Sequence, residues 1–270
     1  MDIKHFTHIR LKPTKRHEIN FNPSDLGKDV EIPKESVELA KKIQNSKKLT
    51  DDFEHDLMIG FEDAFLYGFD YLHNKDKIII PELNPVMIFY SNALMSHRKL
   101  IVSRDELLLN SPTLKNYKKN KIDPNKFGDF FRMATNCIIN LQSSLESFAN
   151  RLIPDDHPFL DKNDIPFEPT IFHKLDKALP IIKNRRFKSK FKKHNYQIRK
   201  LIELRNELIH LKPTQEKTNT KYKIVYRRMM KFDYTLAIIA VENFINFYEP
   251  NLIEHCQCGN EYYFDVHKVE

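Results

Sequence analysis

Residues 127–153, FGDFFRMATNCIINLQSSLESFANRLI, indicate the fold class of this 270-residue chain. Their apolar residues recur at intervals of three and four, the spacing that places side chains on one face of an α-helix. The members of that face are Phe130, Phe131, Ala134, Ile138, Leu141, Leu145, Phe148 and Leu152. Pro154 should end the helix, because proline cannot continue one. The stretch therefore predicts a long helix that packs against other helices.

Further helices are expected on the C-terminal side of this stretch. A short helix is predicted at residues 171–182 and a strong one at residues 196–211, before Pro213. A last helix should run from the capping residue Asp233 to about residue 248. The proline-rich residues 154–170 and the polar residues 212–221 are predicted loops. Together these elements predict a bundle of about four helices.

The N-terminal part is expected to be mostly helical, with minor strand segments. Residues 1–33 suggest an irregular or strand-containing start, and residues 78–80 a brief strand. Helices are predicted at residues 34–48, 51–73 and 86–100, and residues 110–126 read as a linker. The expected organisation is an N-terminal region at residues 1–120, a helical bundle at residues 121–250 and a tail at residues 251–270. The fold class is thus mainly α.

Composition excludes some functions and favours others. The five glycines form neither a GxGxxG nor a GxxxxGK[ST] pattern, which argues against dinucleotide-binding and P-loop enzymes. A net charge of +7 eases association with polyanions, although many basic proteins bind no nucleic acid. Three cysteines and the lack of an apolar leader favour the cytoplasm, and no apolar run is long enough to predict a membrane span.

The helix predicted at residues 196–211 carries an arginine where an apolar residue is expected. Wound at about 100° per residue, its apolar side chains fall in one sector, and Arg205 lies near the middle of that sector. Asn206 and His210 share the polar edge of the same sector. A buried guanidinium needs an anion, because it cannot lose its proton. That anion is either a protein carboxylate, with Glu146 available, or a phosphate.

The segment Arg205–His210, RNELIH, resembles the R-[polar]-x(3)-H signature of the HEPN domain family (higher eukaryotes and prokaryotes nucleotide-binding). The resemblance extends over about residues 127–250, in the order of the long helix, a variable loop region, the motif helix and one more apolar helix. Many members of this family are metal-independent ribonucleases in toxin–antitoxin, abortive-infection and RNA-processing systems. The resemblance implies a homodimer in which two motif helices face each other, and no cofactor or metal.

The resemblance also implies roles for individual residues. Arg205, Asn206 and His210 would be catalytic, and Glu146 is a weaker fourth candidate. Cleavage by an RNA 2′-hydroxyl needs proton transfer, which a histidine performs near neutral pH. It also needs stabilisation of the phosphoryl oxygens, which the planar donor fork of an arginine provides.

Residues 183–193 form a basic segment that is expected to contact RNA. Its candidate nucleic-acid-binding residues are Arg185, Arg186, Lys188, Lys190, Lys192 and Lys193. Phe187 and Phe191 lie between them and could stack on bases. A solvated run of charge is an equally good reading.

Other clusters give weaker signals. His255, Cys256, Cys258 and His267 are potential zinc ligands, but the Cys-x-Cys spacing is one residue shorter than usual, so an exposed tail without metal is expected. His55, His73 and His97 show no metal-ligand spacing and are expected to be ordinary surface or partly buried residues.

Three functional hypotheses follow. The first is a HEPN-type endoribonuclease, with RNA as substrate and an antitoxin protein as a possible partner. The second is an inactive HEPN-like module that binds RNA, a nucleotide or a protein. The third is a structural helical protein in which Arg205 pairs with Glu146.

Overall fold

We describe a computed structural model of the chain, which covers residues 6–18, 33–46, 48–50, 56–61, 64–115, 124–210 and 222–262. The chain forms two compact units. One, the helical unit, comprises Met1–Arg10 and Pro85–Glu270, and the other, the sheet unit, comprises Leu11–Asn84. This division differs from the expected boundary near residue 120, because the helix that follows Asn84 belongs to the helical unit. The protein is mainly helical with one small sheet.

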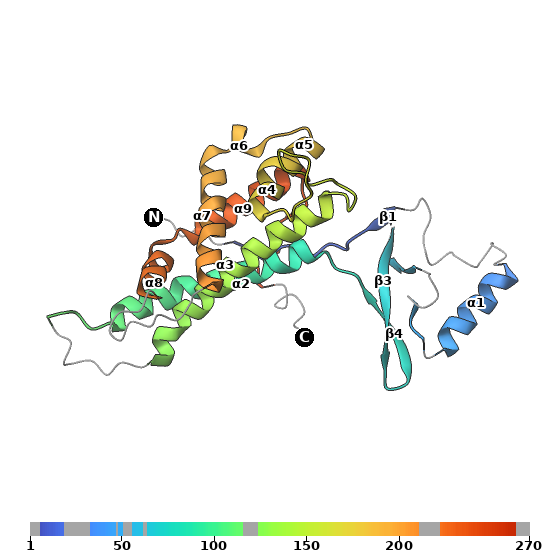
Figure 1. The fold of residues 1–270 in the computed structure, drawn as a ribbon. Helices are drawn as coiled ribbons and strands as arrows, with labels where there is room; N and C mark the ends of the chain where they lie inside the picture. The colour runs from blue at the N-terminus through green and yellow to red at the C-terminus, as the bar shows by residue number, and fades with distance from the viewer. Residues whose placement is uncertain are drawn as a thin grey trace. The chain divides into compact units, whose positions relative to one another are not determined.

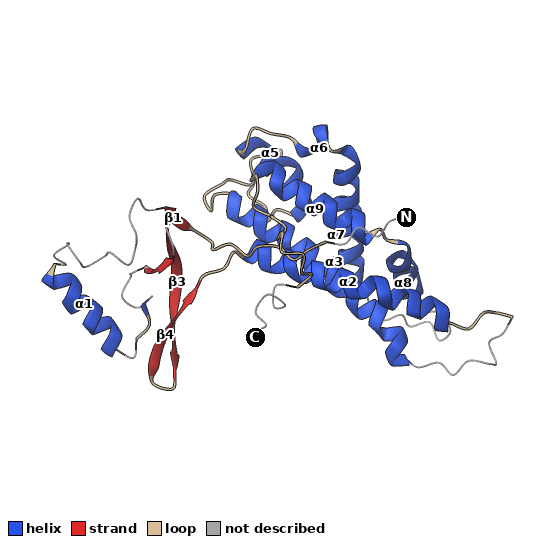
Figure 2. Ribbon diagram, turned by 180° about the vertical axis from the view of Figure 1, so that it is seen from behind, coloured by secondary structure: helices blue, strands red, loops and turns tan. Residues whose placement is uncertain are grey.

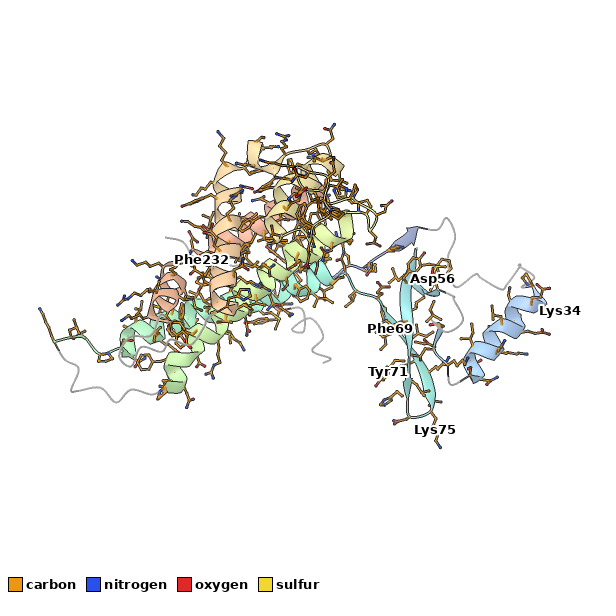
Figure 3. The ribbon with its side chains drawn as sticks, viewed as in Figure 1. Lys34, Asp56, Phe69, Tyr71, Lys75 and Phe232 are labelled. Carbon is orange, nitrogen blue, oxygen red and sulfur yellow. The ribbon has the colours of Figure 1, made fainter. Side chains whose placement is uncertain are left out.

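The sheet unit is built around its longest strand, β3 (Ala64–His73). β1 (Arg16–Glu18) and β4 (Asp76–Pro81) pair antiparallel with β3 along one edge, and β2 (Leu57–Phe61) pairs with it along the other. Asn74 and Lys75, both with positive φ, make the two-residue turn between β3 and β4. Figure 3 shows Lys75 at the tip of this hairpin, with Phe69 and Tyr71 on β3.

The prediction of a helix at residues 51–73 is wrong, because β2 and β3 occupy residues 57–61 and 64–73. The segment is so rich in apolar residues that its pattern matches both a helical and a strand period. Its aromatic residues favour strands, and Gly68 lies where an added Cβ would come 2.7 Å from the carbonyl oxygen of Ile80. Residues 51–55 lie outside the described part of the chain.

A buried polar cluster links the sheet to the end of helix α1 (Lys34–Asn45). Asp70 Oδ1 accepts hydrogen bonds from the backbone N–H of Thr50 at 3.0 Å and from its hydroxyl at 2.7 Å. Lys77 Nζ lies 3.0 Å from Asp70 Oδ2 and donates to the carbonyl of Ile43 at 2.9 Å. Burial raises the pKa of Asp70, but the bonds from Thr50 and the charge of Lys77 outweigh it, so the net pKa is lowered.

The helical unit has two long helices, α2 (Pro85–Asn110) and α3 (Pro124–Leu152), which lie side by side and form its largest helix–helix contact (Figure 1). α7 (Lys192–Ile209) and α9 (Tyr234–Tyr248) pack on each other and on α3, and α9 also contacts α2 (Figure 2). The core between these helices includes Tyr90, Phe130, Leu141, Phe148, Leu201 and Phe244, all no more than 2% exposed. Burial of these large apolar side chains supplies the main force that holds the unit together.

Shorter helices connect the long ones. The chain passes from α3 through a loop to α4 (Ile171–His173), the π-helical turn η3 (Lys174–Ala178), α5 (Leu179–Ile182) and α6 (Phe187–Lys190). α8 (Tyr222–Lys231), which the sequence pattern did not predict, precedes α9. Asp233 caps α9 as expected, accepting a bond from the Leu236 N–H at 2.9 Å. Among the described residues, no helix is both long and apolar enough to cross a membrane.

The two ends of the helical unit meet. Ile9 forms an isolated antiparallel bridge with His255, and the backbone N–H groups of Arg10 and Cys256 donate to the carbonyls of Glu254 and His8. Ile9, Leu252 and Ile253 are buried, at 1%, 7% and 3% exposed. The expectation of an exposed tail from residue 251 is therefore wrong for Leu252 and Ile253, whereas Glu254, Gln257 and Cys258 are exposed.

Candidate functional site

Helix α7 positions the residues that were predicted to be catalytic. Ile198, Leu201 and Ile202 are buried on one face of the helix, as the apolar periodicity predicted, and Leu204, which the predicted sector did not include, is buried as well. Arg205 continues this face and is half-buried. Beyond Arg205 this face is no longer fully covered by other helices, because Leu208 is only half-buried and Ile209 is 48% exposed. The last turn of α7 therefore combines a guanidinium with incompletely covered apolar side chains.

Arg205 has an unusual set of contacts. Its Nη1 donates a hydrogen bond to Asn206 Oδ1 at 3.2 Å. Its Nε is buried and has no hydrogen-bond partner among the described residues. Leaving a buried donor unsatisfied costs about 1–3 kcal/mol, and more for a charged group. The site therefore has unused capacity to bind an anion.

His210 ends the helix. It is exposed, it occupies the C-cap position, and its backbone N–H donates to the carbonyl of Asn206 at 3.0 Å. Within the described part of the chain, its imidazole makes no hydrogen bond to Arg205 or Asn206. The three predicted residues thus lie within one stretch of little more than a helical turn. A side-chain hydrogen bond joins two of them, Arg205 and Asn206.

Glu146 lies on α3 and is bonded elsewhere. Its Oε2 accepts a hydrogen bond from Gln142 Nε2 at 2.7 Å. In the residues that the structure covers, no ion pair or hydrogen bond joins Glu146 to Arg205, Asn206 or His210. The alternative in which Glu146 neutralises Arg205 is therefore not seen in this part of the molecule.

Glu207, the residue after Asn206, links the motif helix to its neighbour. Its carboxylate pairs with Arg228 on α8. Tyr226 on α8 also contacts Phe131 on α3, with the ring centroids 4.7 Å apart. α8 therefore helps to hold the end of α7 in place, although the sequence pattern did not predict this helix.

The basic segment lies at the opposite end of α7. Arg185, Arg186, Lys188, Lys190, Lys192 and Lys193 are all exposed, as RNA contact requires. Eighteen residues separate Lys192 from His210, and at 1.5 Å per residue the two lie about 27 Å apart along the helix. Figure 1 shows α6 and α8 at the two ends of α7. The basic segment and the motif are thus not one compact cluster.

The aromatic residues of this segment serve the core. Phe187 is 2% exposed and packs against Phe244, with the ring centroids 5.0 Å apart. Phe191 stacks on Phe187 at 5.0 Å, and Arg185 lies over the ring of Phe247 at 4.4 Å. The suggestion that Phe187 could stack on bases is therefore wrong, because its ring is enclosed.

Beside the basic segment the surface is hollowed. A pocket of about 460 Å³ lies between η3, α5, α6 and α7, and its charged lining is Asp176, Lys177, Arg186, Lys188 and Arg199. Asp176 forms an ion pair with Arg199. An adjoining hollow of about 480 Å³ is lined by Lys188, Lys192 and Tyr196, among others. These cations could hold phosphates along this face.

Of the candidate zinc ligands, the two cysteines lie close together, but His255 does not lie with them. His255 Nδ1 lies 3.0 Å from the carbonyl of Thr7, and Nε2 lies 3.3 Å from Glu242 Oε2, so both ring nitrogens have partners away from the cysteines. His8 takes the place beside Cys256 and Cys258. Sequence reasoning missed His8 because 250 residues separate it from Cys258. His267 lies outside the described residues.

The other histidines have ordinary structural surroundings. His73 is exposed and its Nε2 lies 3.1 Å from Asn74 Nδ2. His97 is 3% exposed, with Nε2 2.9 Å from Thr235 Oγ1. His55 lies outside the described residues.

The last turn of α7 therefore stands as the candidate site on its own geometry. Arg205 and Asn206 are hydrogen-bonded there and His210 follows at the C-cap, and the Nε of Arg205 has no hydrogen-bond partner among the described residues. Comparisons with protein-family models, with curated proteins and with solved structures found no match to this chain.

Proposed function

We propose that this protein is a metal-independent endoribonuclease of the HEPN type. The observation that carries the proposal is the half-buried guanidinium of Arg205. Its Nε has no hydrogen-bond partner among the described residues, and Arg205 lies beside Asn206 and five residues before His210. An anionic ligand would relieve the unsatisfied donor, and a phosphodiester is the anion that the motif suggests.

The proposed chemistry is attack of an RNA 2′-hydroxyl on the adjacent phosphorus. The new bond joins the 2′-oxygen to phosphorus, and the bond from phosphorus to the 5′-oxygen breaks, which leaves a 2′,3′-cyclic phosphate and a 5′-hydroxyl. Arg205 would neutralise the charge that develops on the phosphoryl oxygens. His210 would transfer a proton to or from the reacting oxygens, and Asn206 would orient Arg205 through the bond between them.

The proposed active form is a homodimer with a HEPN-like four-helix bundle in each subunit. Ile209 is 48% exposed and Leu208 half-buried, so the end of the apolar face of α7 could be covered by a second copy. Two motif helices that face each other would place two sets of Arg205 and His210 around one RNA strand. The basic segment, about 27 Å from His210 along α7, would hold the phosphates of the same strand further along.

A catalytically inactive RNA-binding module is the second candidate, and one observation favours it. His210 is exposed and, within the described residues, forms no hydrogen bond that would fix its imidazole relative to Arg205. A toxin or phage-defence role with an antitoxin partner belongs to the first candidate, and a neighbouring gene for an effector protein would favour the second.

The test is cleavage of labelled single-stranded RNA by the purified chain in EDTA. We expect products that end in a 2′,3′-cyclic phosphate, and a loss of about 100-fold or more in rate for Arg205→Ala and for His210→Ala. Asn206→Ala should lose less of the cleavage rate, because Asn206 acts only by orienting Arg205.

The matched controls remove an arginine or a histidine that lies outside the candidate site. Arg132→Ala changes an exposed arginine on α3, and His73→Ala changes an exposed histidine in the sheet unit. Both should cleave at the wild-type rate. Equal cleavage by wild type, Arg205→Ala and His210→Ala would rule out this site, and RNA binding without cleavage under any ionic condition would establish the second candidate.

A further inference from the structure

The two ends of the helical unit bring three metal-binding side chains together. The pairing of His8–Arg10 with Glu254–Cys256 fixes the backbone of His8 beside the Cys-Gln-Cys segment. One donor atom from each of His8, Cys256 and Cys258 lies within 4.8 Å of the others. His8 is buried at 8% exposed, whereas Cys258 is exposed. The cluster therefore lies at the surface and is anchored on its histidine side.

The distances approach those of a coordinated metal. In a tetrahedral zinc site with Zn–S near 2.3 Å and Zn–N near 2.0 Å, neighbouring ligand atoms lie about 3.5–3.8 Å apart. Cys258 Sγ lies 4.0 Å from His8 Nε2, about 0.5 Å farther than a sulfur and a nitrogen of one tetrahedral zinc site. Rotation of the exposed Cys258 side chain can close the remaining gap without moving the backbone.

The surroundings of His8 suit a ligand. Its Nδ1 lies 3.1 Å from the carbonyl oxygen of Asn260, so Nδ1 carries the proton and donates, and the lone pair falls on Nε2. Metal-binding histidines commonly donate their other ring N–H to a carbonyl in this way, which fixes the ring orientation. The protein thus presents His8 Nε2 as the free donor atom.

The turn after the cysteines suits thiolate ligands. Gly259 has φ of +81°, and the backbone N–H of Asn260 points back to Cys258 Sγ at 3.4 Å. This bond stabilises negative charge on the Cys258 sulfur.

We propose that His8 Nε2, Cys256 Sγ and Cys258 Sγ bind one zinc ion and so tie the N-terminal segment to the C-terminal segment of the helical unit. Two thiolates and one imidazole are a zinc donor set, whereas magnesium and calcium prefer oxygen ligands. Three protein ligands leave one tetrahedral position for water or another donor. The site is separate from the last turn of α7, and the proposal is independent of RNA cleavage.

The test is the metal content of the full chain purified in reducing buffer from zinc-supplemented medium. We expect about one zinc per chain by mass spectrometry of the metal. Cobalt exchanged into the site should give thiolate-to-metal absorption near the visible region. Cys256→Ser, Cys258→Ser and His8→Ala should each lose the ion, while circular dichroism confirms that the variants fold.

His255→Ala is the matched control, because it removes a histidine of the same segment whose ring nitrogens face Thr7 and Glu242. This variant should keep its zinc. Chelation should lower the melting temperature of wild type and of His255→Ala, and leave that of Cys258→Ser unchanged.

Three outcomes would overturn the proposal. The first is no zinc and no cobalt–thiolate absorption in wild type. The second is equal zinc in wild type and Cys258→Ser, and the third is loss of zinc in His255→Ala with retention in His8→Ala. A Cys256–Cys258 disulfide that persists in reducing buffer, seen as a mass lower by two hydrogens, would explain the first outcome and likewise exclude the metal.

Discussion

His97 and Arg205 are ionisable side chains that lie on apolar helix faces of the helical unit, and the protein accommodates them differently. His97 on α2 is 3% exposed and hydrogen-bonds to Thr235. Burial lowers the pKa of His97, Asp233 partly offsets this and Arg98 adds to it, so the net pKa is about 4 and the ring is neutral near pH 7. Arg205 cannot become neutral, and its buried Nε has no partner among the described residues. His97 therefore reads as a packed core residue, whereas Arg205 remains a candidate for binding an anion.

His97 predicts that acid destabilises the fold. In the unfolded chain its pKa should be near 6.5, so the unfolded state takes up the proton first as the pH falls. The free energy of unfolding should decrease between about pH 6.5 and pH 4 by up to about 3 kcal/mol, and no further below that range. Urea unfolding at several pH values measures this contribution. In His97→Asn the decrease should be smaller by that amount, and an unchanged pH dependence would contradict the assignment.

At the scale of elements, α6 and the start of α7 combine an exposed basic surface with an enclosed aromatic core. Phe187 contacts Phe191, Phe244 and Phe247, with ring centroids 5.0, 5.0 and 5.6 Å away. The neighbouring lysines point to solvent. The same short segment can therefore anchor the fold through its rings and attract a polyanion through its charges.

Phe187→Ala should destabilise the protein by about 3–5 kcal/mol, because it removes a fully buried ring and leaves a cavity. Lys188→Ala, one residue away and exposed, should change stability by less than about 0.5 kcal/mol while weakening RNA binding. Thermal unfolding and RNA titration separate the two effects. Unchanged stability of Phe187→Ala together with weaker RNA binding would show that the ring contacts RNA instead.

The helix predictions were correct where a long segment carried apolar residues at helical spacing throughout. α3 and α9 were confirmed because each carries several turns of apolar residues at helical spacing, bounded by Pro154 or by the cap Asp233. The hairpin of β2 and β3 was misread because local spacing cannot distinguish a dense apolar strand from a helix. β3 pairs with β2, with β4 and with the distant strand β1, and this pairing decides its conformation, which the spacing within one segment does not report.

The exposed apolar end of α7 could join two copies of the whole molecule into a dimer. If two copies join through Leu208 and Ile209, the mass in solution should be twice the 32.2 kDa of the chain. Ile209→Asp should then give monomers, because an unpaired carboxylate is costly in an apolar interface. Light scattering coupled to size-exclusion chromatography measures the mass.

The same variant tests whether assembly is needed for cleavage. Ile209→Asp should lose RNA cleavage as it loses the dimer, while an exposed substitution on the same helix such as Lys200→Asp should keep the dimer. A wild-type protein that is monomeric at all concentrations tested, yet cleaves RNA, would exclude the composite site.

The mainly helical class, the long helices and the placement of Arg205 within the apolar face of α7 could be predicted from the sequence. These features are local, because a helix of many turns repeats the same signal at each turn. Only the packing of the folded chain shows that Glu146 bonds to Gln142, that Phe187 is enclosed, and that His8 in place of His255 meets the two cysteines. Such contacts depend on how distant segments pack, and a ligand set drawn from both ends of the chain has no fixed spacing that a sequence pattern could reveal.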